Sequence, residues 1–359
     1  MATFEVTIEN IAVHPHPNAD RLEYAQVGLY NVVVPKGTYK TGDEVFYIPE
    51  FAVLPEALIV ALGLEGKLAG RSKNRVKPIR LRGLLSQGLV ASLDIAEGEL
   101  DRTVRDHSKQ LGIEKWEPEI PVALAGDVTP APELVRWIDI ENIKKFPDMF
   151  KEGELVVVDE KVHGTATCVT VVDALAEPTV YVTSKGIGSR NLALKENPKN
   201  AYWRMFHKYD LLGFAQFIAS RFENISKVAL FGETYGSVQD LHYGLNNELG
   251  FILFDIHLTR TTKEGNVTEW VDPETAEKLA TEAGVPLAPR LYEGPYSLEK
   301  ITELAYGPEK VSGTEANIRE GVVVRPSALN SDKIFEGSRK IGKFVSDDYL
   351  TRADGTEYN

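Results

Sequence analysis

The chain contains one cysteine, Cys168, among its 359 residues. A single cysteine excludes an intrachain disulfide and a cluster of thiolate metal ligands. Long hydrophobic runs are also missing, because no apolar segment approaches the roughly 18 residues that a transmembrane helix needs. The first residues, Met-Ala-Thr-Phe-Glu, lack the basic and apolar regions of a signal peptide. These absences predict a cytoplasmic, globular protein without a membrane partner, and we expect a monomer.

Acidic residues are scarce in one stretch, although they dominate the whole chain. The net charge of -13 argues against nonspecific coating with nucleic acid, but a local site can carry the opposite sign. Residues 66–93 contain no Asp or Glu. The cations of this segment, here called the basic stripe, are Lys67, Arg71, Lys73, Arg75, Lys77, Arg80 and Arg82. The stripe predicts a surface that follows nucleic-acid phosphates, and the alternative is a solvated loop.

The length and the local patterns predict two domains, because 359 residues exceed what one core usually spans. The first part has short strand-like runs at residues 4–11, 24–27, 30–34 and 44–48, separated by turn residues, which is typical of a small β-barrel. Trp116 to Pro132 contains four prolines and is predicted to be a linker. We therefore predict domains at residues 1–125 and 126–359.

The second part mixes predicted strands and helices, so we expect an α+β fold. Apolar, β-branched runs at residues 155–159, 166–172, 228–230, 251–255 and 321–324 are short enough for strands. Residues 198–222 place Tyr202, Met205 and Phe206 on one helical face. Residues 272–284 have an Asp N-cap, a proline at the first position and a closing glycine, which predicts a further helix.

The motif that carries chemistry surrounds Lys161. The chain has no HExxH, no CxxC pair and no GxSxG. Residues 157–166 read Val-Val-Asp-Glu-Lys-Val-His-Gly-Thr-Ala, so Lys161 follows an apolar strand and precedes a His-Gly-Thr turn. This placement predicts a lysine at the mouth of a site, where Gly164 would let a ligand approach the backbone.

This string resembles the nucleotidyl-transfer motif of the covalent nucleotidyltransferases. Its KxHG form is similar to that of RNA ligases related to RNA ligase 2, whereas DNA ligases and capping enzymes usually have KxDG. Further blocks resemble the family's later motifs and follow in the family's order: Ser189-Arg190-Asn191, Phe231 to Gly236, Phe251 to Ile256, Glu320 to Pro326 and Arg339 to Ser346. The resemblance spans about 190 residues.

The first part has a resemblance of its own. Residues 14–23 and 81–89 resemble marker segments of OB-fold modules of the tRNA-binding type, which bind nucleic acid through a cationic face. An OB-like barrel ahead of the ligase domain resembles the Deinococcus-type RNA ligases, the fifth RNA ligase family. A polar tail, Asp347 to Asn359, follows the last motif and leaves no room for the C-terminal OB domain of DNA ligases.

These resemblances imply an ATP-dependent RNA ligase that joins 3′-hydroxyl and 5′-phosphate ends, in RNA or in an RNA/DNA nicked duplex, through a lysyl-AMP intermediate. Lys161 would be the nucleophile, and Lys340 and Lys343 would assist catalysis. Glu233 and Glu320 would bind Mg²⁺ or Mn²⁺, since carboxylate oxygens suit these ions. The implied nucleotide-binding residues are Glu160, Lys161, Arg190, Glu233, Phe254, Glu320, Lys340 and Lys343.

Physical chemistry supports these roles and leaves some of them open. A lysine near its ordinary pKa of about 10.4 is a poor nucleophile, so neighbouring cations, a bound metal or desolvation must favour the neutral amine. Glu233 is alternatively a ligand of the ribose hydroxyls, and Phe251 competes with Phe254 for stacking on adenine. His163 would contact phosphate or pack. The alternative functions are a DNA ligase, a capping guanylyltransferase, and a tRNA-binding protein that has lost catalysis.

Overall fold

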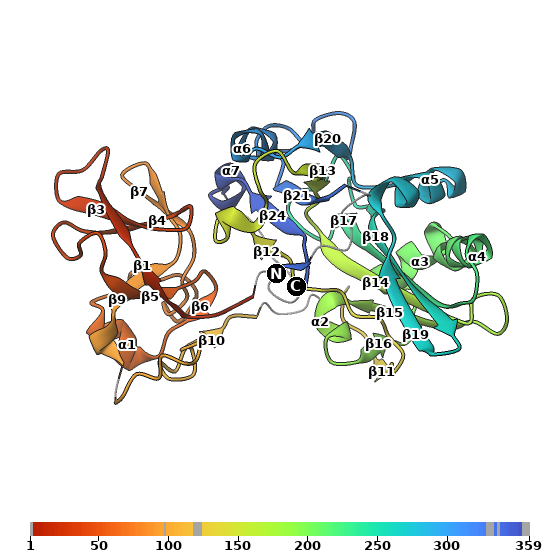
Figure 1. Cartoon of the computed structure of the whole chain (residues 1–359), viewed down its shortest axis with the longest axis horizontal. Helices are drawn as coiled ribbons and strands as arrows, with labels where there is room; N and C mark the ends of the chain where they lie inside the picture. The colour runs from red at the N-terminus through yellow and green to blue at the C-terminus, as the bar shows by residue number, and fades with distance from the viewer. Residues whose placement is uncertain (1–2, 97, 118–123, 328–333, 336–337, 354–359) are drawn as a thin grey trace. The chain divides into compact units, whose positions relative to one another are not determined.

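The computed structural model describes residues 3–96, 98–117, 124–327, 334–335 and 338–353. The chain divides into two compact units (Figure 1): Met1–Glu117 with Ile140–Asp148, and Pro118–Asp139 with Met149–Asn359. No helix in the described ranges is long and apolar enough to cross a membrane. Pro118 and Pro121 of the predicted linker lie outside the described residues.

The first unit is built from short antiparallel strands around β5 (Glu44–Ile48). Strand β5 pairs with β1 (Thr7–Asn10) on one side and with β9 (Leu89–Ser92) on the other. Successive side chains of a strand point to opposite faces, and both faces of β5 are buried: Phe46 and Ile48 pack in one cluster, Val45 and Tyr47 in another. The predicted strands of this unit are confirmed. Its other elements are β2 (Ala12–Pro15), β3 (Leu22–Val27), β4 (Tyr30–Pro35), β6 (Ala52–Val53), α1 (Glu56–Ala61), β7 (Ile79–Leu81), β8 (Leu84–Ser86), a 3₁₀ turn (Leu93–Ile95) and β10 (Glu114–Lys115).

A segment that follows the predicted boundary at residue 125 packs with this first unit. Ile140–Asp148 lies against the turn between β3 and β4, where Leu29 N donates to Lys144 O over 2.6 Å. Gly28 has φ +57°, and a Cβ there would lie 2.6 Å from Lys144 O. Only glycine fits this turn, because both the backbone angle and the close approach oppose a side chain.

The second unit contains a seven-stranded antiparallel sheet in the order β11-β16-β15-β14-β17-β18-β19. Its central strands are β14 (Thr165–Val172), β17 (Ile225–Gly236) and β18 (Leu249–Thr262). The outer strands are β11 (Val128–Pro130), β15 (Thr179–Ser184), β16 (Leu192–Leu194) and β19 (Gly265–Trp270), and α2 (Lys185–Gly188) follows β15. The predicted strands at residues 166–172, 228–230 and 251–255 lie within β14, β17 and β18, so the α+β prediction is confirmed.

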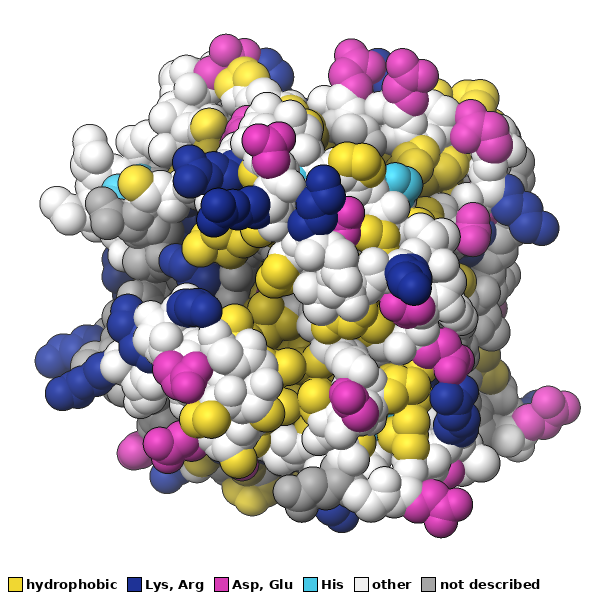
Figure 2. All heavy atoms as spheres, turned by 90° about the vertical axis from the view of Figure 1, so that its left-hand side faces the viewer, with side chains coloured by type: hydrophobic (Ala, Val, Ile, Leu, Met, Phe, Trp, Pro, Cys, Tyr) yellow, Lys and Arg dark blue, Asp and Glu magenta, His cyan; other side chains and the backbone are white. Residues whose placement is uncertain are grey.

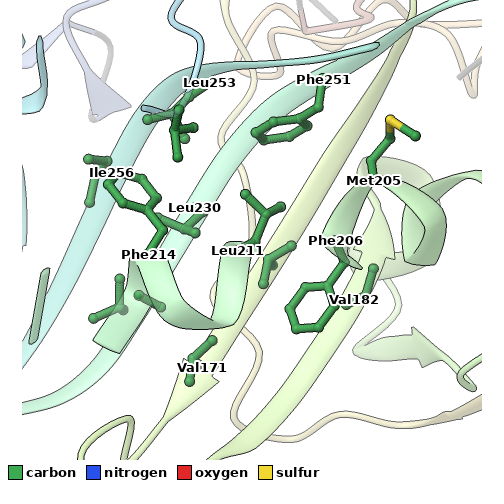
Figure 3. Packing of buried hydrophobic residues seen from close by; sticks show 14 of the residues in the cluster. Val171, Val182, Met205, Phe206, Leu211, Phe214, Leu230, Phe251, Leu253 and Ile256 are labelled. Carbon is green, nitrogen blue, oxygen red and sulfur yellow. The ribbon is translucent and has the colours of Figure 1, made fainter. Parts of the chain in front are cut away.

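Three helices pack on one face of this sheet: α3 (Ala201–Lys208), α4 (Leu211–Arg221) and α5 (Pro273–Ala283). Figure 3 shows Phe206, Leu211 and Phe214 from the helices facing strand residues such as Leu230 and Phe251. The continuous helical face predicted over residues 198–222 is wrong in one respect, since the helix breaks at Asp210. Asp210 has φ +43°, and its side chain caps α4 by accepting from Gly213 N. The predicted caps of α5, Asp272 and Gly284, are confirmed.

A second antiparallel sheet in this unit contains the strands on which Lys161 and Lys343 lie. Its strands β24 (Gly342–Val345), β21 (Gly321–Pro326), β13 (Leu155–Lys161) and β20 (Arg290–Pro295) lie in this order. Helix α6 (Leu298–Ala305) precedes β21, β22 (Ile334–Phe335) pairs with β23 (Ser338–Arg339) in antiparallel orientation, and α7 (Asp347–Leu350) follows β24. The remaining short elements are β12 (Glu141–Asn142) and a 3₁₀ turn (Pro147–Met149).

Candidate active site

The pairing of β13 with β21 brings Lys161 and Glu320 together. Lys161 is the last residue of β13 and lies opposite Gly321, the first residue of β21. Glu320 directly precedes Gly321, so its carboxylate reaches the lysine, and Lys161 Nζ donates to Glu320 Oε1 over 2.5 Å. Glu320 is 6% exposed, and its Oε2 atom has no hydrogen-bond partner among the described residues. The structure thus pairs two residues that are 159 positions apart.

Glu233 reaches the same place from the other sheet. Residues 162–164 connect β13 to β14, and the pairing of β14 with β17 sets Ala166 opposite Glu233. Burial raises the pKa of Glu233 to about 8, Lys161 opposes this rise, and Glu320 adds to it. Glu233, Glu320 and Lys161 therefore form one electrostatic cluster between the two sheets.

Gly164 has a packing role in this arrangement. A Cβ at this position would collide with Thr234 O and lie 3.0 Å from Glu233 Cγ. The sequence predicted a glycine that opens space for a ligand. In the structure the glycine lets the turn after Lys161 lie directly on strand β17, which fixes the distance between the two sheets.

His163 is buried and held on both ring nitrogens. Its Nε2 lies 2.9 Å from Asp240 Oδ1, and its Nδ1 lies 2.9 Å from the Tyr349 hydroxyl. Its backbone N donates to the Tyr243 hydroxyl over 2.6 Å. The Nδ1 atom is also 4.0 Å from Glu320 Oε2. His163 consequently packs in a polar network next to the Lys161–Glu320 pair.

Glu160 holds a loop on the other side of its strand. Neighbouring residues of a strand point to opposite faces, so Glu160 points away from Lys161. Its Oε2 accepts from Lys310 N over 2.8 Å and lies 3.5 Å from Arg319 Nε. Burial raises the pKa of Glu160 to about 7, while the Lys310 N–H and Arg319 oppose this rise.

The two candidate lysines of the last motif have different environments. Lys343 lies in β24 opposite Val323, which in turn lies opposite Asp159. Because Asp159 and Lys161 share a strand face, Lys343 lies on the face that carries Lys161. Lys340 is instead buried against Glu154, with 2.8 and 2.7 Å between its Nζ and the two carboxylate oxygens.

The structure also separates the two candidate aromatic residues. Phe251 is fully buried in the core beneath the helices and contacts Tyr209. Phe254 packs on the opposite face of the sheet with Cys168 and Phe231, edge-on to Trp137 at 5.0 Å between ring centroids. That face also carries Glu233. Cys168 is buried, and this burial raises its pKa to about 12.

Arg190 is exposed in the turn after α2, and within the described part of the chain its side chain makes no recorded hydrogen bond or ion pair. The structure therefore shows no contact between Arg190 and Lys161.

Lys185, at the start of α2, interacts with the Glu233, Glu320 and Lys161 cluster. Its charge opposes the rise in the pKa of Glu233, and its Nζ is 2.6 Å from Asp139 Oδ1. Sequence reasoning missed Lys185, because a single lysine after a strand has no distinctive spacing.

Tyr349, Arg352 and Asp240 are further site neighbours that the sequence did not indicate. The predicted polar tail from Asp347 begins with α7 instead, and Tyr349 of this helix is 4% exposed. A signal was present: Ser346 caps the helix through Tyr349 N, and Tyr349 and Leu350 are apolar. Residues 354–359 of the predicted tail lie outside the described residues.

The residues present fit a divalent cation. Glu320 offers a buried oxygen without a hydrogen-bond partner, and Glu233 has a second carboxyl group in the same cluster. In the described residues, no group of three or more His, Cys, Asp or Glu side chains has metal-ligand geometry. Two carboxylates suit Mg²⁺ or Mn²⁺, which commonly take their remaining ligands from water and substrate phosphates.

The basic stripe is a surface feature of the first unit. Six of its seven cations are exposed, and Arg75 is half-buried with its guanidinium 3.9 Å from the centroid of the Trp116 ring. Figure 2 shows dark-blue Lys and Arg side chains gathered in several groups over the visible face. The stripe includes the exposed end of the β7–β8 hairpin, so cations are presented to solvent at its tip.

Comparisons with protein families agree with this geometry. A model of the RNA ligase family matches residues 154–345, which is more than half of the chain and includes the Lys161, Glu233 and Glu320 cluster. The chain belongs to the RNA ligase family. A model of an OB-fold domain matches residues 5–93, so this RNA ligase has an N-terminal OB-fold domain followed by its nucleotidyltransferase domain. No curated protein matches the chain in a sequence comparison.

Solved structures of an RNA ligase from Naegleria gruberi resemble the whole chain of this RNA ligase. A variant with ATP and manganese is 25% identical, with a TM-score of 0.76 over 96% of this chain and 98% of that chain. The complex with pyrophosphate is 25% identical, with a TM-score of 0.77 over 97% and 98%. A variant without ligand is 25% identical, with a TM-score of 0.78 over 98% of both chains.

Proposed function

We propose that the protein is an ATP-dependent RNA ligase that joins 3′-hydroxyl and 5′-phosphate ends through an AMP adduct of Lys161. The observation that carries this proposal is the contact of Lys161 Nζ with Glu320 Oε1 at 2.5 Å, beside Glu233, in an RNA ligase fold. The similarity to an RNA ligase whose structures contain ATP, manganese and pyrophosphate supports it.

The chemistry requires a neutral lysine. Lys161 loses a proton, for which Glu320 Oε1 is an acceptor in contact, and its nitrogen then attacks the α-phosphorus of ATP. A phosphorus–nitrogen bond forms, the bond between the α- and β-phosphates breaks, and pyrophosphate leaves. Lys343, on the same sheet face, stabilises charge that develops on the α-phosphate. The assignment of Lys340 to this step has less support, because Glu154 already pairs with it.

The next steps use the AMP adduct. AMP passes from Lys161 to the RNA 5′-phosphate, and the 3′-hydroxyl then attacks that phosphate and displaces AMP. A divalent cation held by Glu233 and Glu320 would supply electrostatic stabilisation of the phosphate oxygens. Phe254 lies on the face where adenine can stack, and Arg190 is accessible to a phosphate of the RNA.

The proposed substrate is a nick in RNA or in an RNA/DNA duplex with a ribonucleotide at its 3′-hydroxyl end, as in RNA repair. The exposed basic stripe supports this assignment, since it offers phosphate contacts on a protein with net charge -13. We also propose that the enzyme is of the Deinococcus type, which the order of the OB-fold and ligase domains supports. We further propose that it is monomeric and cytoplasmic.

The test combines labelling and sealing. The wild-type protein is incubated with α-labelled ATP or GTP, and then with nicks whose 3′ end is ribo or deoxyribo. We expect covalent label from ATP and faster sealing of the ribo end, because the 2′-hydroxyl marks RNA. Label from GTP would indicate a capping guanylyltransferase, and equal sealing of both ends would indicate a DNA ligase. No label with either nucleotide would reject the proposal.

A further inference from the structure

A polar network ties the segment after β24 to the turn that follows the nucleophile. Arg352 donates two hydrogen bonds to Asp240, from Nε to Oδ2 at 2.6 Å and from Nη2 to Oδ1 at 3.1 Å. Asp240 Oδ1 in turn lies 2.9 Å from His163 Nε2. Arg352 therefore reaches the turn after Lys161 through one intermediate carboxylate.

Helix α7 makes a second connection to the same ring. The Tyr349 hydroxyl lies 2.9 Å from His163 Nδ1, so the two nitrogens of one imidazole contact two different segments of the chain. With the ring neutral, the carboxylate of Asp240 accepts the Nε2 proton, and the Tyr349 hydroxyl donates to Nδ1. The two contacts together define the orientation of the imidazole ring. With only one of them, the ring could still rotate about the remaining hydrogen bond.

Tyr349 and Arg352 are themselves fixed by local structure. The Arg352 guanidinium lies 3.7 Å from the centroid of the Tyr349 ring, and its Nη1 donates to Tyr349 O over 2.7 Å. The N-cap residue of α7 is bound to the residue that precedes β21, since Ser346 N donates to Glu320 O over 2.9 Å. The Tyr349 ring packs in an apolar cluster with Val162 and Val345, which are neighbours of the site.

We infer that Tyr349, Arg352 and Asp240 are positioning residues for nucleotidyl transfer. They orient His163 and thereby hold the Lys161–Gly164 turn and Glu320 in the geometry that the reaction needs. None of the three need touch the nucleotide. The inference rests on the proposed function, because it concerns the rate at which Lys161 accepts AMP.

The experiment compares Tyr349→Phe, Arg352→Ala and Arg352→Lys with the full-length wild type. Tyr349→Phe keeps the ring and removes only the hydroxyl that contacts His163. Tyr292→Phe is its matched control, since the Tyr292 hydroxyl donates to Pro295 O, and Arg221→Ala is the control for loss of an arginine in an exposed ion pair. Lysyl-AMP formation is measured against ATP concentration, and thermal unfolding is recorded for every variant.

We expect Tyr349→Phe and Arg352→Ala to form lysyl-AMP about tenfold more slowly at saturating ATP, because small displacements of reacting groups are costly. The KM for ATP should change by less than about threefold, since the nucleotide contacts remain. Arg352→Lys should recover part of the rate, because its ammonium can still reach Asp240. Both controls should behave as the wild type.

The possible outcomes separate this inference from the proposed function. A wild type without covalent AMP would reject the proposed function itself. A labelled wild type with Tyr349→Phe at the wild-type rate overturns the inference, whatever Arg352→Ala does. A raised KM for ATP at an unchanged maximal rate also overturns it, since the network would then serve nucleotide binding.

Discussion

The two units of the molecule differ in whether their charged side chains are exposed or buried in ion pairs. The first unit exposes nearly all the cations of the basic stripe to solvent. The second unit buries charged side chains and pairs them: Arg325 with Asp159 at 2.5 Å and Lys340 with Glu154 at 2.7 Å. Exposed cations contribute little to folding but can contact a long polyanion, whereas buried pairs fix side chains in position.

This difference predicts that substitutions in the two units have separable consequences. Removing an exposed cation should change association with RNA and leave the chemistry intact. Removing one partner of a buried pair leaves an uncompensated charge, which should disturb the chemistry, the stability or both. The following predictions go from the largest expected effect to the smallest.

The largest effect is expected at Glu320. We expect Glu320→Ala to lower both lysyl-AMP formation and phosphodiester synthesis by about 10²-fold or more, since it removes a carboxylate that acts wherever charge builds on a phosphate. The measurement is single-turnover labelling, followed by sealing of pre-adenylylated RNA, over Mg²⁺ and Mn²⁺ titrations. Glu315→Ala, in an exposed ion pair of the same unit, is the control. Activity within about tenfold of the wild type would place the metal site elsewhere.

An intermediate effect is expected at the basic stripe. We expect each of Lys73→Ala, Lys77→Ala and Arg82→Ala to lower the salt slope of RNA binding by about one unit and to leave lysyl-AMP formation unchanged. Single substitutions test the stripe more specifically than truncation at residue 125 does. Truncation would also remove the unit against which Ile140–Asp148 packs. Lys278→Ala, at an exposed position of α5, is the matched control. A slope that does not change in the stripe variants would show that RNA binds elsewhere.

The smallest effect concerns stability at Glu160. The pKa of this carboxyl is about 7 in the folded protein, above the ordinary value of 4.5, so the folded state holds more protons than the unfolded state between these pH values. The contribution of Glu160 to stability therefore falls as pH rises from about 4.5 to about 7, by up to about 3 kcal/mol, and then becomes constant. Glu160→Gln should lack this contribution. The free energy of unfolding of Glu160→Gln minus that of the wild type should therefore increase as pH rises.

Thermal unfolding of Glu160→Gln and the wild type at several pH values between 4.5 and 8.5 measures this difference. Glu282→Gln, which alters an exposed ion pair with Arg221, should show no such trend. Parallel curves for Glu160→Gln and the wild type would mean that Glu160 titrates near its ordinary pKa.

Much of this organisation could be predicted from local patterns. The N-cap and closing glycine of α5 and the strand around Glu44 to Ile48 depend on residues close in sequence, and these predictions agree with the structure. The helix break at Asp210 escaped prediction, because the apolar periodicity continues across it and a left-handed residue leaves no mark in that pattern.

The site was harder to predict where it depends on contacts between distant segments. Ordered motifs gave Lys161, Glu233 and Glu320, and β pairing joins them. Motif spacing left Lys340 and Lys343 equivalent, and they are distinguished by the contact of Lys340 with Glu154 and by the strand pairing of Lys343. Asp240 and Arg352 lie 112 residues apart, in a turn and in a tail, so no periodicity or motif could link them.

Lys161 is the residue that we propose to carry AMP, and peptide mass spectrometry after incubation with ATP and Mn²⁺ tests this role. We predict one adenylylated peptide with the modification on Lys161. Lys161→Ala should yield none while unfolding at nearly the wild-type temperature, because Lys161 is partly exposed at the end of its strand. AMP on another residue of the wild type, or undiminished adenylylation of Lys161→Ala, would show that Lys161 does not have this role.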